Sequence, residues 1–164
     1  MNDYSFEMSQ PFLIDRILSL LGLEGGRANS KSTPVGKPLL NKDLSGTERK
    51  YQWNYRSAVG MLTYLTGSTR PDIAMAVHQC ARFSSDPKRS HECAVMRIGR
   101  YLLASRRRGI ICCPNPDKGL EVYVDANFAG AWTKETSSDP SLVYSRTGFV
   151  IKYANCPVYW QSKL

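Results

Sequence analysis

The sequence has no long apolar segment and no leader-like N-terminus. None of its hydrophobic runs approaches the roughly 20 residues that a membrane-spanning helix requires. The first ten residues, MNDYSFEMSQ, do not have the basic start and apolar stretch that mark a secretory signal. We therefore expect an intracellular protein that has no membrane partner.

Cysteine is present, but not in a pattern that favours disulfides or zinc. The five cysteines are an odd number, two of them are adjacent, and no CXXC motif occurs, which together predict a reduced chain. The spacings His78-X-Cys80 and His91-X-Cys93 supply zinc-ligand types. Residues two apart on a helix point about 200° apart, however, so core or boundary positions are the favoured interpretation.

Motifs for nucleotide binding and polymerase chemistry are also missing. The sequence contains no GXXXXGK[ST], GXGXXG or GXSXG. A polymerase hairpin needs two adjacent aspartates after Tyr-X, but here Asp125 is followed by Ala126. Asp125 can instead be a lone metal-binding carboxylate, although the downstream acids are only Glu135 and Asp139, in a polar loop. A partly exposed aspartate at the end of a strand is an equally adequate interpretation.

Acidic residues are scarce in the middle third of the chain. The net charge is +8, from 22 Lys and Arg against 14 Asp and Glu. Residues 51–109 carry ten bases and three acids, whereas residues 1–50 carry seven and six, and residues 110–164 carry five of each. The imbalance is therefore local, and it favours a polyanionic partner for the middle segment.

Apolar periodicity predicts helices in the first two thirds and strands in the last third. Helical spacing covers residues 9–22 with Ser9 as N-cap, about 55–66, 71–83 and 89–107, while residues 24–50 resemble a linker or extended strap. After Gly109 the pattern becomes alternating, around 120–125, 149–153 and 158–160. Helices followed by strands predict an α+β fold in three parts, 1–50, 51–109 and 110–164.

The helix predicted at 89–107 carries separate apolar and basic faces. At 100° per residue its apolar residues fall within one arc, and a second arc holds Arg89, Arg97, Arg100, Arg107 and Arg108. With Arg106, the last two form a run of three arginines. Two interpretations are open, a solvated outer face of a core helix and a stripe that contacts phosphates.

Eight segments, taken in order, resemble one family. They are SQPFLI (9–14), TP (33–34), YRSAVGMLTYL (55–65), TRPDI (69–73), RIGRYL (97–102), VDANFAG (124–130), SRTGF (145–149) and WQSK (160–163). The series is similar to the Pol polyprotein of copia-type LTR retrotransposons over nearly the whole chain. No single motif is decisive, but their order and spacing together are specific.

This resemblance implies a place in Pol for each part of the chain. Residues 1–50 would be the end of the reverse transcriptase region, as an N-terminal helix and extended linker. Residues 51–109 would be a basic helical segment like the thumb and connection. Residues 110–164 would be a truncated RNase H-like domain, represented by an antiparallel three-stranded sheet. The implied fold class is α+β.

The resemblance also implies an incomplete catalytic site. Asp125 would be the first RNase H carboxylate, which binds Mg²⁺ with a Glu and further Asp residues that we expect after Leu164. Asn127 departs from the family, which usually has Asp there. The polymerase aspartates are expected before Met1. The parent enzyme uses Mg²⁺, and we expect this chain to be catalytically incomplete by itself and to need no cofactor alone.

The partner implied by the resemblance is an RNA–DNA hybrid, or another nucleic acid held through its phosphates, together with the remainder of Pol. The residues implied for phosphate contact are Arg89, Arg97, Arg100, Arg106, Arg107 and Arg108. For the parent element the location would be the cytoplasm, in a virus-like particle, or the nucleus. Two alternatives stay open: a stand-alone basic nucleic-acid-binding module without enzymatic activity, and an active minimal nuclease.

Overall fold

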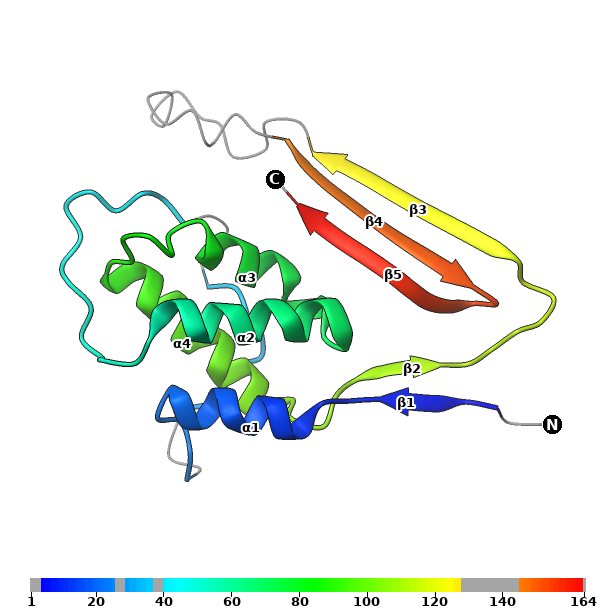
Figure 1. The fold of residues 1–164 in the computed structure, drawn as a ribbon, viewed down its shortest axis with the longest axis horizontal. Coiled ribbons are helices and arrows are strands. Elements are labelled where there is room, and N and C mark those ends of the chain that lie inside the picture. The colour runs from blue at the N-terminus through cyan, green and yellow to red at the C-terminus, as the bar shows by residue number, and fades with distance from the viewer. Residues whose placement is uncertain (1–3, 26–28, 37–39, 128–144, 164) are drawn as a thin grey trace. The chain divides into compact units, whose positions relative to one another are not determined.

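The computed structural model describes residues 4–25, 29–36, 40–127 and 145–163 (Figure 1). Contacts divide the chain into two compact units, Ser9–Ile110 and Met1–Met8 with Ile111–Leu164. The first unit is helical and the second consists of strands. The predicted α+β class is therefore present. The predicted parts 1–50 and 51–109 both contribute to the helical unit.

The helical unit contains four α-helices and a short 3₁₀ turn. These are α1 (Pro11–Leu20), α2 (Tyr55–Ser68), η1 (Pro71–Ile73), α3 (Ala74–Ala81) and α4 (Arg89–Ala104). Each predicted helix is present, with small differences at the ends. The expected Ser9 cap is wrong, because the residue before α1 is Gln10, which makes no side-chain capping bond. At α2 the Asn54 side chain accepts a hydrogen bond from the Ser57 N–H at 2.9 Å.

No helix in the described part of the chain is long and apolar enough to cross a membrane.

The apolar faces of the four helices form one core. It includes Ile14 and Ile17 of α1, Leu62 and Leu65 of α2, and Ile98 of α4, all essentially inaccessible to solvent. The burial of such side chains contributes about 1.5–3 kcal/mol each relative to exposure. The helical periodicity in the sequence therefore identified the side of each helix that packs inward.

The chain after α1 packs closely against α4. Gly22, at the end of the predicted range 9–22, adopts a left-handed conformation with φ of +66° and ends the helix. Leu21 and Leu23 then contact α4 at Gly99, where an added Cβ would lie 2.7 Å from a methyl group of each leucine. The missing side chain at position 99 therefore makes room for both leucines, and any larger residue there would require their side chains to shift.

The strands form two small sheets. β3 (Leu120–Asn127), β4 (Arg146–Tyr153) and β5 (Cys156–Lys163) form an antiparallel sheet in the order β3-β4-β5. β1 (Phe6–Met8) pairs with β2 (Ile110–Cys112). The three strands of the larger sheet were predicted from alternation. β1 was not predicted, because three exposed residues are too few to show a pattern.

One face of the larger sheet is apolar. The alternating residues of β3 that share this face are exposed, at 68%, 56% and 69%: Leu120, Val122 and Val124. Phe149 on β4 lies on the same face and contacts Tyr159 of β5, with ring centroids 5.5 Å apart. The three strands therefore expose part of the surface that strand patterning usually buries.

A buried arginine connects the corner between α2 and η1 to the end of α4. Arg70 is 1% exposed. Its Nε and Nη2 donate to the two carboxylate oxygens of Asp72 at 2.9 and 2.8 Å. Its Nη1 and Nη2 donate to the carbonyl and hydroxyl oxygens of Ser105 at 3.0 and 2.8 Å. The Tyr101 hydroxyl donates to Asp72 at 2.6 Å, which closes the network.

This network also accounts for the end of α4. The predicted helix end at residue 107 is wrong, because α4 ends at Ala104. The carbonyl of Ser105 accepts from Arg70, and the Ser105 hydroxyl donates to the Tyr101 carbonyl at 2.8 Å. With these groups engaged, the helix does not continue, and Arg106–Arg108 lie beyond it.

Replacing Arg70 by lysine tests the network. A lysine keeps the charge but cannot supply the same planar set of donors to Asp72 and Ser105. We expect Arg70→Lys to lower the free energy of unfolding of the helical unit by about 1–3 kcal/mol. The measurement is urea unfolding followed by circular dichroism at 222 nm. Arg16→Lys, at an exposed position on α1, is the matched control, and an equal loss in both variants would contradict this role of Arg70.

Candidate nucleic-acid and metal sites

The predicted arginine stripe lies partly on α4, and its members have different surroundings. Arg89 is paired with Glu92, one helical turn away. Arg97 donates to the Thr33 hydroxyl at 2.8 Å and lies close to Gly36. Arg100 makes no ion pair within the described residues. Two of the three helix arginines are therefore engaged by protein groups.

Segment 40–54 is held against the beginning of α4 by a buried carboxylate. Glu92 is fully inaccessible and accepts hydrogen bonds from the backbone N–H groups of Lys50 at 3.0 Å and Tyr51 at 2.9 Å. Arg89 and Arg49 flank the same carboxylate. We call residues 29–36 together with 40–54 the strap. Glu92 was not singled out in the sequence, although a lone acid in a basic helix was an available signal.

His91 provides the second attachment of the strap. Its Nδ1 accepts from the Lys88 N–H, and its Nε2 lies 2.9 Å from the Asn41 carbonyl oxygen. The ring stacks on Phe83 with a centroid distance of 4.1 Å. Both nitrogens are thus engaged in structural hydrogen bonds. His91 is buried and Cys93 is exposed, which agrees with the interpretation of this His-X-Cys pair as core or boundary positions.

The three consecutive arginines lie in the connection after α4. Arg106 is paired with Asp15 of α1, and its side chain is 53% exposed. Arg107 and Arg108 are exposed, and neither forms an ion pair with any carboxylate in the described ranges. This end of α4 therefore presents basic groups to solvent. Contact of the six arginines with phosphates stays a prediction.

Asp125 occupies an exposed position on the edge strand β3, two residues before the end of the strand. It lies on β3 opposite Gly148 of β4. Within the residues described, no group of three His, Cys, Asp or Glu side chains could hold a metal ion. Glu135 and Asp139 lie outside the described residues, as does the side chain of Asn127. The described residues by themselves do not fit a magnesium site.

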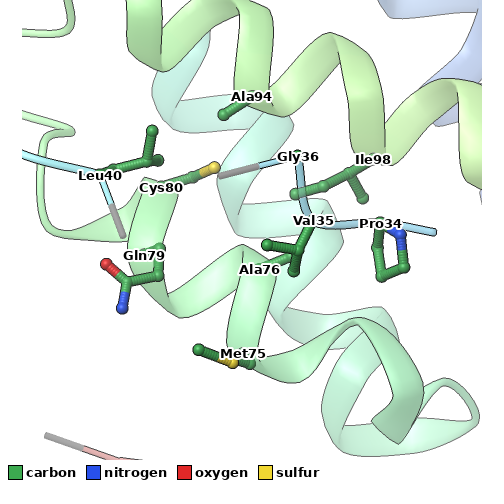
Figure 2. Close-up of a pocket in the computed structure, with 10 residues that line it drawn as sticks. All are labelled: Pro34, Val35, Gly36, Leu40, Met75, Ala76, Gln79, Cys80, Ala94 and Ile98. Carbon is green, nitrogen blue, oxygen red and sulfur yellow. The ribbon is translucent and has the colours of Figure 1, made fainter. Parts of the chain in front are cut away.

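Two of the cavities lined by described residues lie in the helical unit. The smaller lies under the strap, where Figure 2 shows Val35 beside Ala76 of α3 and Ile98 of α4. Its volume of about 30 Å³ has room for roughly one water molecule. Cys80 also lines it, and burial raises the pKa of this thiol to about 12, which makes it a poor nucleophile at neutral pH.

The larger cavity, of about 510 Å³, lies between the end of α1, the strap and α4. Tyr51, Gln52 and Trp53 of the strap line it, together with Met96 and Arg100 of α4. Trp53 stacks on Tyr55 with ring centroids 5.9 Å apart. No sequence pattern indicated this cavity, because its walls come from three segments that are distant in the chain.

Curated proteins similar to this chain include transposon polyproteins. It is 34% identical over 163 residues to the retrovirus-related Pol polyprotein from transposon TNT 1-94 of Nicotiana tabacum, which covers 96% of this chain and 11% of that protein. It is 34% identical over 136 residues to the corresponding polyprotein from transposon RE1 of Arabidopsis thaliana, which covers 83% and 9%. The chain thus spans about a tenth of the length of these relatives.

A third relative has a different name. The chain is 36% identical over 109 residues to secreted RxLR effector protein 161 of Plasmopara viticola, which covers 66% of this chain and 71% of that protein. No family model matches the chain. No solved structure matches it either.

Two hydrogen-bonded carboxylates, the buried Glu92 and the partly exposed Asp72, predict a loss of stability in acid. Burial would raise the pKa of Glu92, but hydrogen bonds from the Lys50 and Tyr51 N–H groups and from Arg89 outweigh it and lower the pKa. At Asp72, burial is likewise outweighed by hydrogen bonds from Arg70 and Tyr101, so its pKa is also lowered. Groups with a lowered pKa in the folded state stabilise it above their unfolded pKa of about 4, and this contribution is lost as the pH falls below that value.

We expect Glu92→Gln to reduce both the stability at pH 7 and its decline towards pH 3. The loss at pH 7 should be about 1–3 kcal/mol, because the buried donors lose a charged acceptor. Urea unfolding at the two pH values measures both effects. Glu48→Gln, at a carboxylate whose side chain is 81% exposed, is the control and should change stability by less than about 1 kcal/mol. If the free energy of unfolding of Glu92→Gln fell between pH 7 and pH 3 as much as that of the unchanged chain, Glu92 would not be a source of the acid sensitivity.

Proposed function

The chain belongs to the copia-type retrotransposon Pol polyproteins, and we propose that it corresponds to the segment where the reverse transcriptase ends and the ribonuclease H begins. Support comes from the order of the elements, in which the helical unit Ser9–Ile110 precedes most of the antiparallel strands. A helical thumb and connection followed by the first RNase H strands would have this order. The remainder of Pol is then the natural protein partner.

The activity that we propose for this segment is binding of an RNA–DNA hybrid through its phosphates. The observation that carries the proposal is the exposed pair Arg107 and Arg108 at the end of α4, unpaired within the described residues. Arg106 lies beside them, half-exposed. Guanidinium groups hold phosphates without reading sequence. Arg89 and Arg97 are engaged by Glu92 and Thr33, so they would first have to leave these partners.

Asp125 has a more limited role in the proposal. In the parent enzyme it would be one of several carboxylates around Mg²⁺. Here the described residues form no group of three or more His, Cys, Asp or Glu side chains that could hold a metal ion. We therefore propose that this chain binds a hybrid and does not cleave it.

Binding of a labelled RNA–DNA hybrid tests the first part of the proposal. We expect affinity to fall as salt rises, because phosphate contacts release counterions. Arg107→Gln/Arg108→Gln should weaken binding and lower the slope of log affinity against log salt by about 2. Arg16→Gln/Arg56→Gln removes the same charge from exposed positions on α1 and α2 and should leave the slope nearly unchanged. Equal effects in the two double variants would refute a site at the end of α4.

Incubation of the same hybrid with the chain and Mg²⁺ or Mn²⁺ tests the second part. We expect intact hybrid on a denaturing gel, because one carboxylate is too few for two-metal hydrolysis. Cleavage that disappears in Asp125→Asn would show that the chain is an active nuclease. Cleavage that persists in Asp125→Asn would indicate a contaminating enzyme, and the preparation would be repeated until that background is removed.

A further inference from the structure

Two cysteines that are distant in the sequence meet in the strand unit. Cys112 is the last residue of β2, and Cys156 is the first residue of β5. The Cys112 thiol donates a hydrogen bond to the Cys156 sulfur. Both residues belong to the same compact unit, so their contact does not depend on how the two units are placed.

Backbone hydrogen bonds hold the chain beside this pair. The Asn115 N–H donates to the Ala154 carbonyl at 2.9 Å, and the Ala154 N–H donates to the Gly119 carbonyl at 3.2 Å. The connection between β2 and β3 therefore lies against the turn that leads into Cys156 (Figure 1). Ala154 and Asn155 form that turn with positive φ angles of 48° and 66°. The backbone thus positions both sulfur atoms, and little further approach is needed to reach the roughly 2.05 Å of a disulfide.

The two thiols differ in their accessibility. Cys112 is 2% exposed, whereas Cys156 is half-buried. Burial, and then the hydrogen bond to Cys156, raises the pKa of Cys112, so its thiol is protonated and unreactive at neutral pH. A reagent from solvent therefore reaches Cys156 first, and Cys112 lies next to it as a resolving thiol.

Cys113 is a separate thiol beside the pair. Adjacent side chains at the end of a strand point to opposite sides, and Cys113 is exposed where Cys112 is buried. In the part of the chain that the structure describes, no group of three His, Cys, Asp or Glu side chains could hold a metal ion. The arrangement therefore favours chemistry between two thiols.

We propose that Cys112 and Cys156 form a reversible disulfide when the chain meets a low-molecular-weight disulfide such as oxidised glutathione. The Cys156 thiolate attacks one sulfur of the reagent, forms a mixed disulfide and releases one thiol. Cys112 loses its proton to solvent and attacks the Cys156 sulfur, which forms the protein disulfide and releases the second thiol. Two protein thiols are oxidised and one reagent disulfide is reduced, so no other oxidant is needed.

The link would join the end of β2 to the start of β5 and close a loop that contains β3 and β4. In a chain that the sequence predicts to be reduced, such a bond would be transient. The proposal is independent of hybrid binding, because Arg106–Arg108 belong to the helical unit. The failure of either proposal therefore leaves the other standing.

Mass spectrometry of the chain after treatment with oxidised glutathione tests the inference. Trypsin separates Cys112 and Cys156 into the peptides 109–118 and 153–163. From the folded chain we expect these peptides joined, with the loss of two hydrogens, and their separation by dithiothreitol. The chain oxidised in concentrated urea is the control and should give several cysteine pairings. The same yield of this link from both samples, or no link from the folded chain, would overturn the inference.

The peptide 109–118 also contains Cys113, so the bonded residue must be identified. Fragmentation of the joined peptides from the unchanged chain should assign the bond to Cys112. Cys113→Ser, at an exposed position, should keep the link. Cys112→Ala should abolish it and leave Cys156 as a mixed disulfide with glutathione. A bond assigned to Cys113, or loss of the link in Cys113→Ser, would overturn the inference.

Discussion

The helical unit depends on neutralising one buried charge, the guanidinium of Arg70. A charged group at 1% exposure is costly unless its donors are satisfied. Its partners lie at two places, Asp72 two residues along the chain and Ser105 at the end of α4. The corner after α2 and the end of α4 must therefore meet. The same bonds end the helix before Arg106, so the most basic stretch of the chain lies in a connection and not on a helix face.

A second buried charge determines the path of the strap. Glu92 accepts from the N–H groups of Lys50 and Tyr51, and this holds a segment with no helix or strand of its own against α4. Two consequences follow for function. Arg89 is drawn into the neutralisation of Glu92 and is not simply a solvated cation. The strap also brings Trp53 opposite the end of α1, and the larger cavity exists because of that placement.

The two units differ in charge, and this difference is compatible with membership of the Pol polyprotein family. The surplus of basic residues lies within the helical unit, whereas residues 110–164 carry equal numbers of bases and acids. A segment of a Pol polyprotein that holds nucleic acid by phosphates would carry its charge in this way. The strand unit carries Asp125 on β3 and exposes the apolar residues Leu120, Val122 and Val124 of the same strand.

The sequence by itself determined the positions of the helices and strands, the α+β class, the local charge and the family, because these depend on residue spacing, composition and the order of motifs. It also placed Arg107 and Arg108 among the exposed basic groups. It did not predict the short strand β1 or the end of α4. Only the tertiary structure decided which arginines are engaged, because Glu92, Thr33 and Asp15 reach Arg89, Arg97 and Arg106 from distant points or across a helical turn. Burial of Arg70 and Glu92 was likewise invisible in the sequence, since a charged residue is buried only where the fold brings its partners to it.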